Sequence, residues 1–513
     1  MVDDDTTGFK YSLHIYYSKE NMVKKVTKSK LPVVLFLIIL SVAAFLRIWG
    51  TVNGNFAFTY DVGRDFLEIH KQVFLHDFSL LGPTSGQGGV FYGPWWYWLM
   101  AVPFFLLGGS PTGMVLVIVL SGLLAVTVAF FWGRRWENDN FALIMAGILG
   151  FSPFFIGATS QFWNPNLLIL VTLLVLVLLS FAEKLNFKQL FIFGFLSALA
   201  IELQLFFGTF LFLGVLVCLI IFQRRIVFSK RILAFFLGAL FIELPRVIFE
   251  INHEFLQTTV FFNTLGKNVT QQYDLSLRAK ILLEFLSSVW PVYNLTMVFV
   301  FTLIALTVFV LIIKREKERE KKNFYSQIGL LLIMYFAATL FYKKDFWNYY
   351  LTGLPALLLI PVSAVLSKVL QKGKKWSIVG AFLFTMLFLK PADILQSIKE
   401  PKFTGDASVY RNQVEVVDYL YQQANGQKFN VTVYTPPIYS YTWDYLFLWY
   451  GQKKYKQVPD QKPTGLLFLV IEPDPGYPGR ITDWLKTRQG DGAIKKEKAF
   501  PSGIIVQSRF RSL

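Results

Sequence analysis

Long apolar segments follow one another through most of this chain and constrain its fold more than any other feature. They have 15 to 21 residues each, close to the roughly 20 that a helix needs to cross a bilayer. Backbone polar groups find no water in hydrocarbon, so such segments are expected to be helical. The candidate spans are residues 31–49, 112–132, 141–158, 166–182, 190–206, 207–222, 232–246, 294–313, 324–342, 349–369 and 376–391. The sequence therefore predicts a polytopic α-helical membrane protein of about eleven transmembrane helices.

Composition and charge agree with this class. Of the 513 residues 54% are hydrophobic and 17% are aromatic, and the mean hydropathy is +0.48, which is more apolar surface than one soluble core requires. The net charge of +17 comes from basic residues in short runs between the apolar segments. That distribution follows the positive-inside rule rather than forming a basic face for nucleic acid. It predicts a multi-pass protein of a prokaryotic plasma membrane with a cytoplasmic N-terminus.

The chain divides into three parts. Residues 1–30 are expected to form a cytoplasmic N-terminal segment, and residues 31–390 the transmembrane domain. Residues 391–513 have the composition of a small soluble α/β domain, expected on the extracytoplasmic side. Within the transmembrane part, the apolar stretch 95–107 is short and flanked by glycine and proline, so we expect it to be re-entrant or interfacial.

Four charged residues lie close together just after the first span: Asp61, Arg64, Asp65 and Glu68. Charged groups beside a bilayer are costly unless they are solvated or paired, so this cluster predicts a wet functional surface. A carboxylate held there can act as a general base toward a hydroxyl group. The alternative is a solvated amphipathic helix that begins near Asp65 and carries Glu68 on its outer face.

Several segments resemble those of one enzyme family. They are "FTYDVGRD" from residue 58, "GGVFYGPWWYWLMAVPFFLLGG" from 88, "GFSPFFIGATSQFWNPNLLIL" from 150, "ELPRVIFEINHEF" from 243 and "DFWNYYLTGLPALLL" from 345. In this order they resemble the GT-C-fold glycosyltransferases that use lipid-phosphate sugars, which include protein O-mannosyltransferases, the lipid A aminoarabinose transferase and their bacterial relatives. The resemblance covers most of residues 31–390.

The resemblance implies an integral membrane glycosyltransferase. Such an enzyme moves a hexose or pentose from a polyprenyl-phosphate donor to an acceptor hydroxyl on a protein, lipid or glycan outside the cytoplasm. Asp61 matches the Asp that serves as catalytic base in the family. The candidates for binding the donor phosphate or the substrates are Arg64, Asp65, Tyr92, Gln161, Asn164, Arg246, Glu250, His253, Lys343 and Lys344. Arg246 is the preferred phosphate ligand, because a guanidinium grips phosphate with two parallel hydrogen bonds.

The chain departs from the family pattern at three positions. Val62 replaces the Glu that usually follows the catalytic Asp, so Asp65 is a candidate for the second carboxylate. Asn164 stands where relatives often carry an acidic residue, and Gln204 stands where some carry His. The sequence therefore does not support a divalent metal, and no other cofactor is implied.

Two other classes remain open. A secondary transporter places polar groups near the bilayer midplane, and Glu202 and Glu243 are candidates for such groups. A lipid-linked glycan polymerase or ligase would share the polyprenyl-phosphate substrate. The position of "YDVGRD" directly after the first span favours the transferase. Purely structural roles also remain open for some of these residues. Asn164 could cap a helix, and Arg246, Lys343 and Lys344 could anchor helices at the membrane interface.

Overall fold

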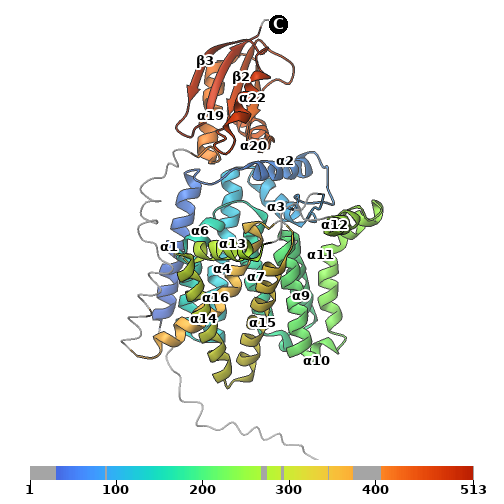
Figure 1. Ribbon diagram of the computed structural model, residues 1–513, viewed down its shortest axis with the longest axis vertical. Helices are drawn as coiled ribbons and strands as arrows, with labels where there is room; N and C mark the ends of the chain where they lie inside the picture. The colour runs from blue at the N-terminus through green and yellow to red at the C-terminus, as the bar shows by residue number, and fades with distance from the viewer. Residues whose placement is uncertain are drawn as a thin grey trace, which may run out of the picture.

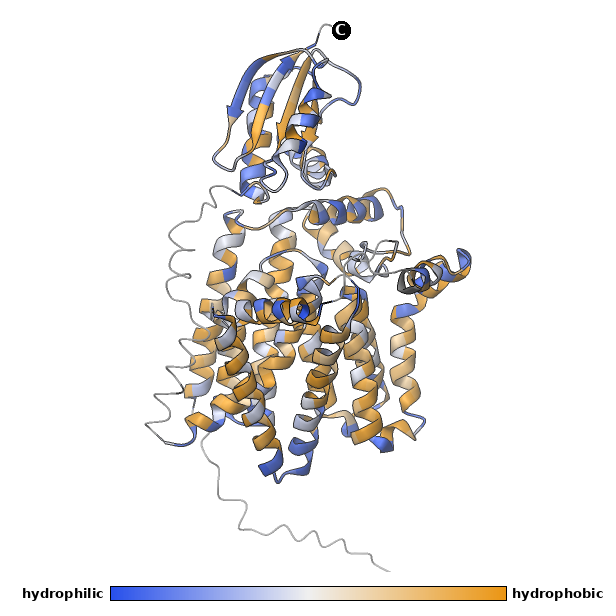
Figure 2. Ribbon diagram, viewed as in Figure 1, coloured by the Kyte–Doolittle hydropathy of each residue, from blue (hydrophilic) through white to orange (hydrophobic). Residues whose placement is uncertain are grey.

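A computed structural model describes residues 30–86, 89–266, 274–290, 294–344, 346–373, 380 and 406–511. The described chain forms a bundle of helices with a small sheet-containing domain at one end (Figure 1). Figure 2 shows hydrophobic residues along the bundle helices and hydrophilic residues gathered at the two ends of the bundle. We call the end that carries the small domain the domain end.

Ten of the eleven predicted spans contain helices, and the eleventh, residues 376–391, lies outside the described residues apart from Gly380. Six described helices are long and apolar enough to cross a membrane: α1 (Leu31–Val52), α4 (Pro111–Trp136), α9 (Leu205–Phe222), α11 (Ile232–Asn252), α14 (Leu295–Arg315) and α15 (Arg319–Phe341). The other predicted spans correspond to α5 (Asp139–Phe151) with α6 (Pro153–Ala158), α7 (Leu168–Ser180), α8 (Phe187–Leu203) and α16 (Leu354–Leu370). The protein is therefore an integral membrane protein, as expected.

Two local breaks divide the predicted spans differently from the sequence reading. The segment 141–158 is interrupted at Ser152, because Pro153 begins a new short helix there. The boundary between α8 and α9 falls at Gln204. The Gln204 side chain accepts a hydrogen bond from the Phe207 backbone N–H and caps α9. A polar residue that caps a helix thus ends α8 earlier than hydropathy indicates.

Several shorter helices lie toward the domain end or along the bundle. They are α2 (Tyr60–Phe74), α3 (Trp95–Leu106), α12 (Leu256–Gly266) and α13 (Leu275–Val289), while α10 (Arg224–Val227) lies at the opposite end (Figure 1). Helix α3 has 12 residues, or about 18 Å at 1.5 Å per residue, too short for a hydrocarbon core of about 30 Å. Short 3₁₀ helices span Asn164–Leu167, Ala182–Lys184 and Asn348–Leu351.

The small domain is an α/β unit, as the sequence predicted. Its sheet has the order β1-β2-β4-β3, with β1 (Phe429–Tyr434) parallel to β2 (Leu466–Ile471) and β4 (Ile505–Phe510) antiparallel to both β2 and β3 (Ala493–Ala499). Its helices are α19 (Tyr410–Ala424), α20 (Tyr441–Leu446), α21 (Gln452–Tyr455) and α22 (Pro478–Lys486), with a π-helical turn, Phe447–Gly451, between α20 and α21. Buried residues of β2 and α19 form its core.

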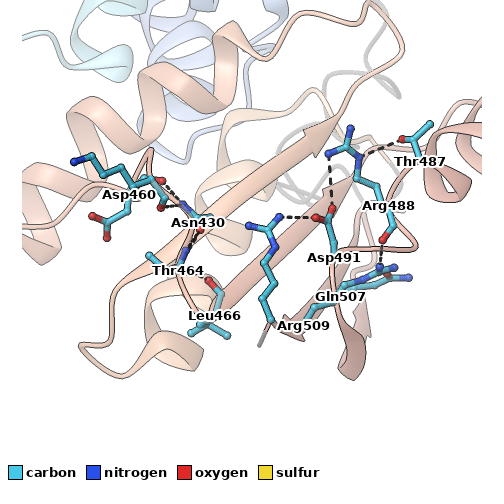
Figure 3. Close-up of polar contacts among 11 residues, drawn as sticks. Asn430, Asp460, Thr464, Leu466, Thr487, Arg488, Asp491, Gln507 and Arg509 are labelled. Carbon is cyan, nitrogen blue, oxygen red and sulfur yellow. Dashed lines mark hydrogen bonds and ion pairs between the residues drawn. The ribbon is translucent and has the colours of Figure 1, made fainter. Parts of the chain in front are cut away.

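Polar side chains fix the loops around this sheet (Figure 3). The Asn430 side-chain oxygen accepts a hydrogen bond of 2.6 Å from the Thr464 backbone N–H, next to the start of β2. Arg509 on β4 donates a bond of 2.7 Å to the Arg488 carbonyl oxygen. These bonds tie connecting loops to strands within the domain.

The small domain is docked on the loop after α1 through backbone and side-chain hydrogen bonds. The Phe58 N–H donates to the Ser408 carbonyl oxygen at 2.8 Å. The Phe58 carbonyl oxygen accepts bonds from the side chains of Gln413 and Thr442. Gly63 permits the close contact of α2 with α20, because a Cβ atom there would lie 2.4 Å from the Thr442 backbone nitrogen. The loop after α1 and the small domain therefore form one packed unit.

Candidate active site

Asp61 lies in the first turn of α2, at the point where the bundle meets the small domain. An acidic residue is favourable there because the helix N-terminus carries partial positive charge. Val62, Phe66 and Ile69 are buried and hold the helix against its neighbours. The Asp61 side chain itself keeps 28% of its surface exposed. The fold therefore fixes the backbone of Asp61 while leaving its carboxylate open to a ligand.

Arg64 joins the two aspartates of this helix. Its Nη1 lies 2.8 Å from Asp61 Oδ1, and its Nη2 lies 2.8 Å from Asp65 Oδ1. The same guanidinium donates a 2.9 Å hydrogen bond to the Thr84 hydroxyl. One cation between two carboxylates leaves the group with a net negative charge when both are ionised. The arrangement orients Asp61 without neutralising the pair.

Asp65 is fully buried and anchors this arrangement. In addition to Arg64, it accepts hydrogen bonds from Trp96 Nε1 at 2.9 Å and from the Tyr97 hydroxyl at 3.1 Å, both on α3. Burial raises the pKa of the Asp65 carboxyl, and the ion pair with Arg64 opposes that rise. Because Arg64, Trp96 and Tyr97 all donate to it, the Asp65 side chain holds α2 against α3.

Three cavities meet around Asp61 and Trp163. The first, which we call the domain cavity, has a volume of about 550 Å³ and lies between the small domain and residues 57–62 and 161–163 of the bundle part. The second, the central cavity, has about 210 Å³ and is lined by Asp61, Arg64, Tyr92 and Asn164. The third, the aromatic cavity, has about 520 Å³ and is lined by Phe154, Phe285, Phe346 and Trp347. Asp61 lines the first two, and Trp163 lines all three.

Tyr92, Gln161 and Asn164 all lie at these cavities. Tyr92 is buried in the wall of the central cavity, and burial raises the pKa of its phenol. Gln161 lines the domain cavity and the aromatic cavity. Asn164 donates a 2.6 Å hydrogen bond to the Leu203 carbonyl oxygen at the end of α8. The structure thus brings Asp61 and Asn164 to one cavity although more than 100 positions separate them in the sequence.

Arg246 has a different environment. It forms an ion pair with Glu202 and a second one, at 2.8 Å, with Glu243. These are the two carboxylates on which the transporter alternative depended, and both are compensated by the same guanidinium. Among the described lining residues, Arg246 does not reach the three cavities around Asp61. Its expected role as a phosphate ligand stays a prediction.

Glu250 lies in the last turn of α11, and His253 directly follows that helix. The Glu250 carboxylate accepts hydrogen bonds from the backbone N–H groups of Gln257 at 3.1 Å and Thr258 at 2.9 Å, and so fixes the start of α12. The exposed His253 ring stacks on Phe249 with 4.0 Å between ring centroids. In the described structure neither residue lines the three cavities.

Lys343 and Lys344 lie just before Phe346 in the chain, and Phe346 lines the aromatic cavity. The Lys344 carbonyl oxygen accepts a 2.8 Å hydrogen bond from Arg278 on α13, and the Arg278 guanidinium lies 4.8 Å from the centre of the Phe346 ring. Arg278 was missed at the sequence level because nothing in the chain between α13 and residue 344 signals their contact. The Arg278 guanidinium therefore lies beside a ring that forms part of the wall of the aromatic cavity.

Metal-binding side chains do not gather at this site. Within the described ranges, no group of three or more His, Cys, Asp or Glu side chains could hold a metal ion. Asp61 and Asp65 lie four positions apart on the helix, and Arg64 contacts an oxygen of each.

The overall fold matches that of solved membrane enzymes. The crystal structure of ArnT from Cupriavidus metallidurans bound to undecaprenyl phosphate superimposes with a TM-score of 0.58 at 14% identity, covering 94% of this chain and 99% of that one. The chain has the GT-C fold. The apo form of the same ArnT gives a TM-score of 0.57 at 13% identity, over 93% of this chain and 97% of that one.

A match at the sequence level accompanies the GT-C fold. Residues 92–249 match the family model described as dolichyl-phosphate-mannose-protein mannosyltransferase. No curated protein sequence gives a significant match. The matched segment begins at Tyr92 and runs through Trp163 and Arg246, so it includes residues of the central cavity. Together the two findings confirm the resemblance to the GT-C glycosyltransferases.

Proposed function

We propose that this GT-C protein transfers a sugar from a polyprenyl-phosphate donor to an acceptor hydroxyl on the extracytoplasmic side of the membrane. The observation that carries the proposal is the position of Asp61, which lines both the domain cavity and the central cavity. A base at this junction can reach an acceptor in one cavity and the anomeric carbon of a donor in the other. Positioning of this kind supplies a large part of enzymatic rate enhancement.

The isoprenoid chain of the donor has a suitable place in the aromatic cavity, which adjoins the central cavity at Trp163, Trp347 and Tyr349. Its walls of Phe154, Phe285 and Phe346 are apolar, as an isoprenoid chain requires. Arg278 lies against the Phe346 ring in this wall, and Lys343 and Lys344 precede Phe346 by three and two positions, so these three cations are the candidates for holding the phosphate. The related ArnT crystal contains undecaprenyl phosphate, which supports the same ligand class here. Among the phosphate candidates from the sequence, this arrangement favours the lysine pair over Arg246.

The reaction then follows from acid–base chemistry. The Asp61 carboxylate takes the proton of the acceptor hydroxyl as that oxygen attacks the anomeric carbon. The bond from the anomeric carbon to the phosphate oxygen breaks, and the lipid phosphate leaves with both bonding electrons. Nearby cations stabilise the charge that develops on the phosphate. Arg64 keeps Asp61 oriented during the step.

Lipid analysis tests this proposal directly. The wild-type protein and Asp61→Asn would be purified from the same membranes, and the co-purifying polyprenyl phosphates would be measured by mass spectrometry. We expect sugar-charged carriers to accumulate on Asp61→Asn, because the donor binds but is not discharged. Asp77→Asn is the matched control, since Asp77 is an exposed residue just beyond the same helix. Equal carrier profiles in all three proteins would remove Asp61 as the base.

A further inference from the structure

The domain cavity is built from both parts of the molecule. The outer loops contribute Tyr60, Asp61 and Trp163. The small domain contributes Gln413 from α19, Tyr439 from the loop before α20, and Glu472, which follows β2. Its volume of about 550 Å³ falls in the range of roughly 300–1,000 Å³ that small-molecule sites occupy. The cavity is therefore large enough for a substrate and touches the candidate base.

The charge of this cavity has one sign. Three carboxyl groups line it: Asp61, Asp406 and Glu472. Among the described lining residues there is no Lys, Arg or His. Arg64 contacts Asp61, but it lines the central cavity and is already paired with both Asp61 and Asp65. A phosphorylated ligand would therefore face the carboxylates with no cation in the described wall of the domain cavity, and like charges in apposition disfavour wrong partners. The cavity thus selects against anionic ligands.

Gln413, which lines this cavity, has a buried hydrogen-bond acceptor with no partner among the described residues. The side chain is 1% exposed, and its Nε2 donates to the Phe58 carbonyl oxygen at 3.2 Å. That bond fixes the amide orientation, so the free atom must be the acceptor Oε1. Gln413 Oε1 is buried with no partner among the described residues. A buried acceptor without a partner costs free energy unless a ligand or water supplies a donor.

Three hydroxyl groups of the cavity are already committed. The Thr435 hydroxyl donates to the Tyr439 carbonyl oxygen at 3.0 Å, and the Thr442 hydroxyl donates to the Phe58 carbonyl oxygen at 3.4 Å. The Ser408 hydroxyl donates to Asp406 at 2.7 Å. The three carboxyl groups, in contrast, offer acceptor oxygens to a ligand. A ligand that matches them supplies O–H or N–H donors.

Aromatic rings form part of the wall. Tyr60 and Tyr439 stack across the boundary between the two parts, with 6.3 Å between ring centroids, and Trp163 lies at the inner side. Aromatic faces carry negative charge and suit the C–H faces of a sugar ring. Rings together with acceptor atoms match a compound that has apolar C–H faces and many hydroxyl groups.

We propose that the domain cavity binds the acceptor and selects an uncharged carbohydrate, with Gln413, Glu472 and Tyr439 as specificity-determining residues. This inference rests on the proposed transferase function for its meaning, but it concerns binding alone. The carbohydrate hydroxyls donate to Gln413 and Glu472, and one hydroxyl faces Asp61. Phosphorylated acceptors are excluded by the carboxylates. The acceptor thus comes from the side of the small domain, opposite the donor in the aromatic cavity.

The test is a binding comparison that needs no turnover. Full-length Asp61→Asn protein in nanodiscs would be titrated with maltotriose and with maltotriose phosphate. We expect the neutral probe to bind at least about tenfold more tightly, a difference of about 1.4 kcal/mol. Glu472→Lys should reduce or reverse this ratio by adding a cation to the cavity. Equal or tighter binding of the phosphorylated probe, or no saturable binding of the neutral probe, would overturn the inference.

A second variant protects the test against misfolding of Glu472→Lys. Tyr439 is 54% exposed, so Tyr439→Ala should fold normally and weaken the neutral probe by about tenfold. The matched control is Tyr477→Ala, since Tyr477 is 61% exposed on the same domain and does not line the cavity. Unchanged binding in Tyr439→Ala would also contradict the inference. Selective binding without any sugar transfer would instead reject the proposed function and leave this inference standing.

Discussion

The Arg64 guanidinium lies 2.8 Å from the Asp61 carboxylate and thereby sets the direction in which the candidate base points. The geometry depends on one planar group that meets two carboxylates at once. Lysine carries the same charge but presents a single ammonium and cannot reproduce the two-pronged contact. The orientation of Asp61 is therefore sensitive to the chemical type of residue 64.

Arg64→Lys should lower kcat by about 10- to 100-fold, because small displacements of a reacting group cost that much. The KM for the donor should change little, since the charge is kept. Steady-state kinetics and a thermal unfolding curve would separate this effect from a loss of folding. Lys71→Ala is the matched control, because it removes an exposed ion pair with Glu68 on the same helix and such pairs contribute little. Wild-type kcat in Arg64→Lys would reject the positioning role.

Gly63→Ala should separate the small domain from α2. The added Cβ atom would lie 2.4 Å from the Thr442 backbone nitrogen, and overpacking of this kind costs about 1–3 kcal/mol. We expect faster proteolysis within α20 and lower transfer activity, while insertion into the membrane is kept. In the control Gly479→Ala, the new methyl group meets nothing within 4 Å. Similar protease resistance of both variants would show that the contact tolerates a methyl group.

Arg246→Ala should destabilise the bundle strongly. Glu202 is buried and would lose its partner, and breaking such a buried pair costs about 3–5 kcal/mol. Thermal unfolding in detergent would measure this loss, and adding Glu202→Gln and Glu243→Gln should restore much of it. Donor binding to the restored triple variant would then decide the phosphate role. Weak binding despite restored stability would favour Arg246 as a phosphate ligand, and normal binding would assign it a structural role.

The stability of the small domain should depend on pH through Glu472. Burial raises the pKa of Glu472 to about 7, although the Trp443 indole N–H donates a hydrogen bond that opposes the rise. A raised pKa in the folded state means that the protonated form is favoured by folding, so its stabilising contribution is present at low pH and is lost as pH rises through about 7. The unfolding temperature should therefore fall between pH 5.5 and pH 8. Glu472→Gln should flatten this part of the pH dependence.

Much of the bundle could be predicted because apolar length alone specifies a membrane helix. Asp61 could be nominated as the candidate base from the sequence, because a carboxylate shortly after a span has few structural explanations. The strand β3 could not, because its residues "AIKKEKA" are mostly exposed and lack apolar alternation. Lysines on an edge strand protect it from pairing with another chain, and they hide it from a hydropathy pattern.

The residues that contact the candidate site could not be predicted from the sequence, for a different reason. Trp96 and Tyr97 contact Asp65 across 31 and 32 positions of the chain, and Gln413 contacts Phe58 across 355 positions. No local pattern encodes such contacts, because they arise only when the small domain is docked. The sequence could nominate Asp65 as a ligand, whereas the structure makes it a buried support.

The peptide group of Phe58 connects the small domain to a backbone position three residues before Asp61. A molecule that grips the small domain and tilts it would therefore pull on this stretch of chain from a distance. Antibody fragments raised against the exposed face of the domain could act as inhibitors without entering any cavity. A chimera that takes its small domain from a relative would likewise be active only if the loop of residues 54–58 were exchanged together with the domain.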